Sequence, residues 1–283
     1  MIVKTLIGAS QIEVGLKCLK SLLLNCRDSI VLHIHDDGSL RKTDEKRLLE
    51  CLPGAQVIGK PLADSAVTPH LQSYPRCLAY RERHPLALKL FDICLLTPEL
   101  ESFLFCDSDV YFFRPFSVHE ALRGLRGSVF MQDNQEAYAL YPWHVGPLGP
   151  FSVGSRVNTG FMHLHNSLLD LRTVEGYLEW AAHKSAAAKR PQWMEQTSWA
   201  ILSQNCDSWI WDPRQVFVAG PTTASLPPDA VAIHFVSTYR SQLDGYLRQL
   251  PPASKSAVVL RRQSLQRASL LSLALREIRS HVR

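Results

Sequence analysis

Long apolar runs, paired cysteines and a strong overall charge are all missing from this 283-residue sequence. No apolar stretch approaches the ~18 residues of a membrane-spanning helix, so no span is predicted. Seven cysteines are scattered without a C-x-x-C pair, which argues against a zinc site or a disulfide framework and favours a reducing compartment. The stretch from Met1 to Gly8 is too short and wrongly flanked for a signal peptide, and we expect a cytoplasmic protein.

The basic charge is confined to the C-terminal part of an otherwise ordinary globular composition. Residues 255–283 contain seven Lys or Arg and one acidic residue, Glu277, and therefore carry a net charge of +6. Because the total is +5, residues 1–254 carry a net charge of −1. We therefore expect a globular domain over residues 1–254 and a tail over residues 255–283. Apolar residues interleaved with arginines predict one or two basic amphipathic helices there. Such helices bind an anionic membrane surface or pack on the domain, and we expect no nucleic-acid partner.

The N-terminal part alternates between strand-like apolar stretches and stretches with helical spacing. The expected strands span residues 2–9, 29–35 and 55–59, and the expected helices span residues 12–24 and 43–52. This order is typical of a parallel sheet covered by helices. Later strands are expected at 128–132, 157–166, 216–218 and 231–236, and later helices at 86–96, 119–125, 169–182 and from 195 onward.

Two segments lack a clear period and are expected to be loops. Residues 61–76 contain three prolines. Residues 135–156 are rich in Gly, Pro and aromatic residues, and a loop of this length is usually a lid or a binding loop. Its aromatic side chains either stack on a flat ligand or anchor the loop to the body.

The most informative stretch is the apolar run from Phe103 to Cys106, which is followed by Asp107 and Asp109. Such a run predicts a buried strand, and open α/β sheets bind ligands at the carboxyl ends of their strands. Two carboxylates there repel each other unless a divalent cation neutralises them. Mg²⁺ or Mn²⁺ held by few carboxylates completes its shell with water and substrate phosphates. The alternative is a pair of turn aspartates at a strand end.

Three other polar positions each have two interpretations. Asp37, with Asp36 before it, follows the strand at 29–35 and either faces the same crevice or forms a tight turn. Lys89 lies in an apolar helix and either reaches a diphosphate or extends to the surface. Glu195 lies in the first turn of a helix, where the helix dipole alone could account for a carboxylate.

Taken together, six segments resemble nucleotide-sugar glycosyltransferases of the GT-A fold, most closely the retaining family eight. In chain order these segments are D-D-G-S at 36–39, the helix with Lys89, F-L-F-C-D-S-D-V at 103–110, V-N-T-G-F-M at 157–162, E-Q-T-S-W-A at 195–200 and H-F-V-S-T-Y-R at 234–240. The resemblance implies an α/β protein with a mixed, mostly parallel central sheet flanked by helices. It also implies transfer of a sugar from a nucleotide-diphosphate sugar to a glycan or other hydroxyl acceptor.

The same resemblance assigns roles to individual residues. Asp107, Asp109 and His234 would hold Mn²⁺ or Mg²⁺ against the donor's diphosphate. The implied catalytic residues are Gln196, Glu195 and Asn158, and the implied substrate-binding residues are Lys89, Asp133, Gly160, Arg240, Ser10, Asp37 and Ser108. Arg240 stands where the family has a lysine, and Lys89 where it often has an arginine. Ala9-Ser10-Gln11 lacks the acid and tyrosine that usually grip uracil, although UDP is still the expected nucleotide.

The expected reaction develops negative charge on the diphosphate, which a metal, Arg240 and Lys89 would stabilise. We favour retention of the anomeric configuration, whereas inversion would require a base, with Glu195 as the first choice. Three other classes are compatible with an Asp-x-Asp motif or with sugar binding. They are a phosphohydrolase of the haloacid dehalogenase type, a nucleotidyltransferase and a carbohydrate-binding protein without catalytic activity.

Overall fold

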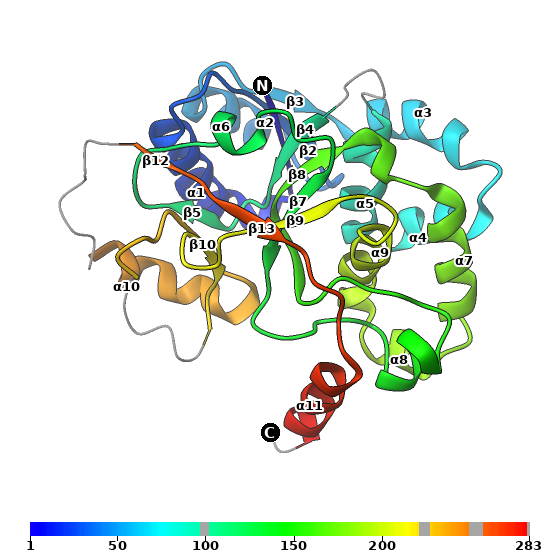
Figure 1. The fold of residues 1–283 in the computed structure, drawn as a ribbon. Helices are drawn as coiled ribbons and strands as arrows, with labels where there is room; N and C mark the ends of the chain where they lie inside the picture. Colours follow the sequence, from blue (N-terminus) through cyan, green and yellow to red (C-terminus); the bar gives the residue numbers. More distant parts are fainter. Residues whose placement is uncertain (97–101, 221–226, 249–256, 282–283) are drawn as a thin grey trace.

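The fold is built on one large mixed sheet with helices on both faces (Figure 1). The computed structural model describes residues 1–96, 102–220, 227–248 and 257–281. The strands are β1 (Ile2–Ile7), β2 (Val31–Asp36), β3 (Gln56–Ile58), β4 (Ser102–Cys106), β5 (Val110–Phe112), β6 (Phe116–Ser117), β7 (Ser128–Gln132), β8 (Val157–His165), β9 (Ser208–Trp211), β10 (Val216–Val218), β11 (Ala232–His234), β12 (Val258–Val259) and β13 (Arg262–Ser264).

The sheet follows the order β3–β2–β1–β4–β8–β7–β10–β11–β5, with β9 beside β7 and β13 beside β9. The strands β5, β8 and β13 pair antiparallel with their neighbours. The other strands of this sheet run parallel to one another. The prediction of a mixed, mostly parallel central sheet is therefore confirmed.

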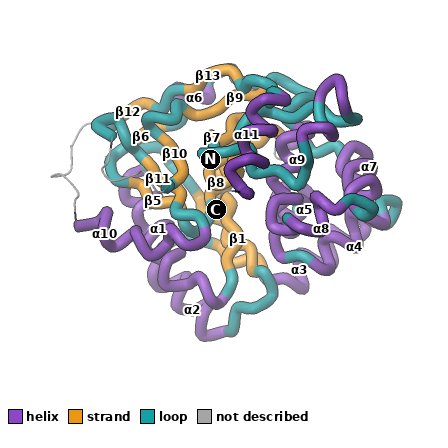
Figure 2. The backbone as a smooth tube through the Cα atoms, turned by 90° about the horizontal axis from the view of Figure 1, so that it is seen from below, coloured by secondary structure: helices purple, strands orange, loops and turns teal. Residues whose placement is uncertain are grey.

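Helices cover both faces of this sheet, as the view in Figure 2 shows. They are α1 (Ile12–Asn25), α2 (Lys42–Cys51), α3 (Lys60–Leu71), α4 (Pro75–Arg83), α5 (Pro85–Leu95), α6 (His119–Leu122), α7 (Leu171–Ala181), α8 (Ser185–Lys189), α9 (Met194–Leu202), α10 (Leu243–Arg248) and α11 (Leu270–His281). Successive residues of β4 point to opposite faces. Phe103 and Phe105 pack in the core that contains α5, α7 and α9, while Leu104 and Cys106 pack in the core of α1 and α2.

The predicted loop at residues 61–76 is wrong, because most of it is helical. Helix α3 begins at Lys60 and helix α4 at Pro75. Pro61 and Pro75 lie in the first turns of these helices, where a backbone N–H has no intrahelical partner and proline is tolerated. Pro61 and Pro75 were therefore start signals here, whereas Pro69 lies inside α3, two residues before its end. Strand β9 was not predicted at all.

The C-terminal segment is less helical than the sequence predicts, since residues 258–264 form two short strands. Strand β12 pairs with β6, and β13 pairs with β9. Leu260 between them is buried in the core, and this docking on the sheet overrides the helical spacing. Among the described residues of this segment, only those of α11 are helical. The predicted boundary after residue 254 lies outside the described residues, as does Lys255, so the division into two domains stays a prediction.

Helix α11 packs on the body through a buried arginine. Arg276 is 4% exposed. It donates hydrogen bonds to the main-chain carbonyls of Glu136 and Tyr138 at 2.9 and 2.7 Å, and a third one to Leu140. No helix among the described residues has the length and apolar character needed to cross a bilayer.

The segment between β7 and β8 contains two short 3-10 turns, Pro142–His144 and Gly146–Leu148. The fully buried Tyr138 donates its hydroxyl to the Gly154 carbonyl. Phe151 packs edge-on against Trp180 of α7, with ring centroids 4.9 Å apart. These aromatic residues therefore anchor the loop to the body, which was one of the two interpretations of the sequence.

Candidate active site

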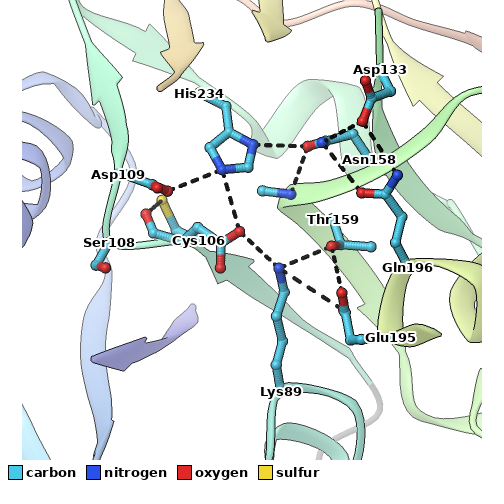
Figure 3. Close-up of polar contacts among 12 residues, drawn as sticks. Lys89, Cys106, Ser108, Asp109, Asp133, Asn158, Thr159, Glu195, Gln196 and His234 are labelled. Atoms are coloured by element: carbon cyan, nitrogen blue, oxygen red, sulfur yellow. Dashed lines mark hydrogen bonds and ion pairs between the residues drawn. The ribbon is translucent and has the colours of Figure 1, made fainter. Parts of the chain in front are cut away.

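Three potential metal ligands meet at the carboxyl edge of the sheet (Figure 3). Asp107 and Asp109 lie between β4 and β5, and His234 ends β11. One ligand atom of each residue lies within 4.8 Å of the others. The His234 Nε2 is 3.0 Å from Asp109 Oδ1 and 3.5 Å from Asp107 Oδ2. The structure therefore brings together the three residues that the sequence suggests as metal ligands, and their role as ligands stays a prediction.

Strand pairing brings His234 to the aspartates. Strands β5 and β11 are antiparallel neighbours, and His234 lies opposite Val110, the residue after Asp109. The Phe235 N–H donates to the Asp109 carbonyl at 2.9 Å, which continues this ladder. The separation in sequence is thus bridged by backbone hydrogen bonds, and the side chains need no loop to bring them together.

Asn158 on β8 fixes the orientation of the imidazole. The Gly160 N–H donates to Asn158 Oδ1 at 3.0 Å, which identifies this oxygen as an acceptor. The His234 Nδ1, 2.9 Å from the same oxygen, must therefore carry the proton and donate it. The other ring nitrogen, Nε2, then faces the two carboxylates, as a metal-binding histidine does.

Gly160 provides the space for this imidazole. A Cβ at position 160 would lie 2.2 Å from His234 Nδ1 and within 2.7 Å of two further ring atoms. The Gly160 carbonyl also accepts a hydrogen bond from the Asp107 N–H at 2.6 Å. The small residue therefore holds both the carboxylate loop and the histidine in place.

Two cations flank the carboxylates. The Lys89 Nζ lies 2.8 Å from Asp107 Oδ2 and 4.0 Å from Glu195 Oε1. Lys89 is 3% exposed, so the interpretation as a surface lysine is wrong. On the other side, Arg240 Nε lies 2.8 Å from Asp109 Oδ2, and its side chain is 39% exposed.

This environment shifts the pKa values of the central groups. Burial alone would raise the pKa of Asp109, but His234 and Arg240 overcome this effect and lower it to about 2. Burial would lower the pKa of His234, yet the Asp109 and Asp107 carboxylates leave it above its ordinary value. Burial raises the pKa of Glu195 to about 7, although Lys89 opposes this shift. Asp109 is thus a ready anionic ligand, while Glu195 is poised between two protonation states.

A second polar cluster adjoins the first through Asn158. Its Nδ2 donates to Asp133 Oδ2 at 3.0 Å and lies 3.5 Å from Gln196 Oε1. The Gln196 Nε2 donates to Asp133 at 3.3 Å and to the Ala137 carbonyl at 3.2 Å. The amides and the Asp133 carboxyl therefore form one network beside His234.

Thr159 is a site residue to which sequence reasoning gave no role. Its hydroxyl accepts from Lys89 Nζ at 2.9 Å and donates to Glu195 Oε2 at 3.1 Å. It lies within the V-N-T-G-F-M segment, so its position next to Asn158 on a strand was the available signal.

The remaining predicted residues lie around the ends of β1 and β2. Ser108 donates to Gln11 Oε1 at 3.3 Å, and Gln11 is another residue without a predicted role. Ser10 is exposed and lies with Gln11 in the 3-10 turn Ala9–Gln11. Gln11, and not Ser10, is the N-cap residue of α1. Asp37 accepts from the Ser39 N–H at 2.9 Å, as expected for a turn, and its carboxylate also packs against Gly8.

Comparisons of sequence and of structure gave different results. No protein-family model matches the sequence, and a search of curated proteins found no match. Among solved structures, mouse xyloside xylosyltransferase 1 in its apo form is similar, with 12% identity and a TM-score of 0.53 over 83% of this chain and 97% of that chain. The bifunctional glycosyltransferase WbbM, also in an apo structure, has 10% identity and a TM-score of 0.54 over 84% of this chain and 46% of its own.

The chain has the GT-A fold. At these identities the likeness concerns the fold, which confirms the fold predicted from the sequence motifs. Membership of family eight stays a prediction. This chain spans about half the length of WbbM.

The close contact between Gly160 and His234 predicts the effect of a single methyl group. In Gly160→Ala the new Cβ displaces the imidazole, and we expect Mn²⁺ affinity to fall about 10- to 100-fold. Calorimetric titration with Mn²⁺ measures this change. The control is Gly176→Ala in α7, where a Cβ meets nothing within 4 Å. Equal Mn²⁺ affinity in both variants would mean that His234 does not bind the ion.

The raised pKa of Glu195 predicts a pH-dependent difference in stability. The unfolded chain binds this proton with the ordinary pKa of 4.5 and the folded chain with a pKa of about 7. Between these values the folded state holds the extra proton, so this group's contribution to the free energy of unfolding falls as the pH rises.

We therefore compare wild type with Glu195→Gln, which keeps the shape and removes the titration. Relative to wild type, the variant should gain roughly 2–3 kcal/mol between pH 4.5 and pH 7. Denaturant unfolding at both pH values measures the gain. A constant difference between the two proteins would show that Glu195 has the same pKa in the folded and unfolded chains, so that its pKa is not raised.

Proposed function

We propose that this chain is a metal-dependent glycosyltransferase that moves a sugar from a nucleotide-diphosphate sugar to a hydroxyl group of a glycan or another acceptor. One observation carries the proposal: Asp107, Asp109 and His234 converge at the carboxyl edge of a GT-A sheet. Ligands of open α/β sheets bind at this edge. UDP is the nucleotide we expect in the donor.

The donor set fits Mn²⁺ or Mg²⁺. Carboxylate oxygens suit both ions, and the imidazole nitrogen favours Mn²⁺ of the two. The oriented Nε2 of His234 and the ionised Asp109 support this fit. When bound, the ion would act as a Lewis acid that neutralises charge on the diphosphate.

Lys89 and Arg240 are the proposed partners of the leaving diphosphate. Rupture of the sugar–phosphate bond leaves extra negative charge on the phosphate oxygens, which preorganised cations stabilise. Arg240 is partly exposed and can turn from Asp109 toward a phosphate, whereas Lys89 is buried against Asp107. Ser108, Ser10 and Asp37 would contact the nucleotide.

Asn158, Gln196 and Asp133 are proposed to surround the sugar, with Gly160 forming the wall beneath it. Their hydrogen-bonded network offers amide donors and a carboxyl acceptor to sugar hydroxyls. Glu195 is held by Thr159 and faces Lys89. We favour a positioning role for this carboxyl group and retention of configuration, because retention needs no strong base near the acceptor.

The donor site is tested by thermal-shift measurements with a panel of nucleotide sugars and Mn²⁺. We expect a UDP-sugar to stabilise the wild type in the presence of Mn²⁺ and to have no effect on Asp109→Asn. Hydrolysis of the same donor should be lost in parallel. Asp229→Asn, which removes a carboxylate that is 55% exposed, is the control and should behave as wild type.

Equal shifts for wild type and Asp109→Asn would contradict the proposed site. A carbohydrate-binding protein without catalytic activity would instead bind glycans with neither Mn²⁺ nor nucleotide. A phosphohydrolase would cleave the diphosphate of the donor with water, giving UMP and a sugar 1-phosphate, and would transfer no sugar.

We also propose that the C-terminal segment contacts an anionic membrane surface, so that a cytoplasmic enzyme works at the membrane. Helix α11 exposes Leu271, Leu275 and Ile278, which are spaced as one face of a helix. Arg267 before this helix is exposed, whereas Arg276 is buried and faces the body. Apolar insertion would therefore contribute more to binding than the basic charge.

The membrane proposal predicts that the triple variant Leu271→Ser/Leu275→Ser/Ile278→Ser loses flotation with phosphatidylserine liposomes and keeps donor hydrolysis. Leu62→Ser, which alters an exposed leucine of α3, is the control. Undiminished flotation of the triple variant would exclude α11 as the contact.

A further inference from the structure

A solvent-open cavity of about 260 Å³ lies between the main sheet and the C-terminal segment, and most of its lining residues are exposed. Gln132 at the end of β7 lines one wall, and the turn with Ser155 and Arg156 lines another. The C-terminal segment supplies Gln263, Ser264 and Gln266. Figure 1 shows β13 running alongside β9 near β7, which places this segment against the sheet. The volume is just below that of drug-sized pockets and suits one sugar residue.

Six of the seven lining residues carry polar side chains, and Ile210 of β9 is the apolar one. Among the described residues, no intramolecular hydrogen bond engages the side-chain amides of Gln132, Gln263 and Gln266. Each amide offers both a donor and an acceptor, and adjacent hydroxyls of a sugar require both. Arg156 is the one charged side chain among the lining residues, so the cavity favours an anion.

Arg156 is held in a conformation that its residue type disfavours. Its φ is +49°, in the left-handed region that side chains with a Cβ rarely adopt. Two hydrogen bonds maintain it: the Arg156 N–H donates to Glu136 Oε2 at 2.6 Å, and its carbonyl accepts from the Asp133 N–H at 2.6 Å. Strain that is supported in this way is frequent at ligand-binding positions.

The buried Glu136 carboxylate connects this turn to the C-terminal segment. Its Oε1 accepts hydrogen bonds from Ser155 at 2.8 Å and from Ser272 of α11 at 2.9 Å. Arg276 of the same helix donates to the Glu136 carbonyl. The Glu136 carboxylate thus links the turn with Ser155 to the C-terminal segment, and α11 helps to hold the cavity walls in place.

The cavity adjoins the proposed sugar site through Asp133. This residue directly follows Gln132, and its N–H bonds to Arg156 while its carboxyl group accepts from Gln196. A molecule in the cavity would therefore lie next to the network that surrounds the transferred sugar.

We propose that this cavity binds part of the acceptor, namely a sugar residue that carries an anionic group. The Gln132, Gln263 and Gln266 amides bond its hydroxyls, and Arg156 pairs with its carboxylate or phosphate. The identification of the bound sugar as part of the acceptor rests on the proposed function. Binding of a sugar in the cavity does not, because it requires neither donor nor metal.

Saturation-transfer NMR on the full chain, without metal or nucleotide, tests the site with glucuronic acid, glucose 6-phosphate and glucose as probes. We expect at least one acidic sugar to bind more tightly than glucose. Whichever acidic sugar binds more tightly identifies carboxylate or phosphate as the anion. Arg156→Asn should weaken the preferred acidic sugar about tenfold or more and remove its advantage over glucose.

Asparagine tolerates positive φ, so this variant keeps the turn and removes the charge. Arg172→Ala, at an exposed position of α7, is the matched control and should bind as wild type. The double variant Gln263→Ala/Gln266→Ala should weaken all three probes. Equal affinities for glucose and both acidic sugars, or unchanged binding in Arg156→Asn, would overturn the proposal.

Failure of this site and failure of the proposed function are distinguishable. If the protein hydrolyses a UDP-sugar but shows no preference for acidic sugars, only the proposed role of the cavity is refuted. If it binds acidic sugars but hydrolyses no donor, the proposed transferase activity is refuted and the cavity remains a saccharide-binding site.

Discussion

Two carboxylates separated by one residue impose the central constraint on this molecule: Asp109 is buried, and Asp107 is partly buried. Like charges at this spacing repel strongly where water is scarce, so the ionised pair persists only if positive groups surround it. Lys89 contacts Asp107, Arg240 contacts Asp109, and His234 lies between the two. These three groups come from a helix, a 3-10 turn and a strand, so the charge balance depends on the assembly of the whole sheet.

A single amide transmits this constraint to the neighbouring network. Asn158 accepts from the His234 imidazole and from the Gly160 N–H, and it donates to Asp133. Its orientation sets the imidazole tautomer and at the same time organises the groups proposed to hold the sugar. One side chain therefore connects the proposed metal site with the proposed sugar site.

The C-terminal segment is part of this construction. Strand β13 extends the sheet beside β9, and Arg276 of α11 holds the segment that carries Glu136 and Tyr138. Ala137 and Ala139 in the same segment bond to Gln196 and Thr197 of α9. The chain from 136 to 140 is therefore clamped between α9 and α11, which links the last helix to the wall of the proposed active site.

Local sequence determined the elements and part of the site. The apolar run before Asp107 and Asp109, together with the early alternation of strands and helices, was enough to predict the sheet and the carboxylate pair. Local pattern misjudged residues 61–76 and 258–264. Proline begins helices as well as ending them, and docking on an existing sheet overrides weak helical spacing.

Only the tertiary structure decided that Lys89 is buried and that Thr159 and Gln11 belong to the proposed site. It also decided that Arg240 contacts Asp109, which lies 131 residues earlier in the sequence. These contacts depend on the pairing of β5 with β11 and of β4 with β8, and strand partners distant in sequence leave no local periodicity from which to predict them.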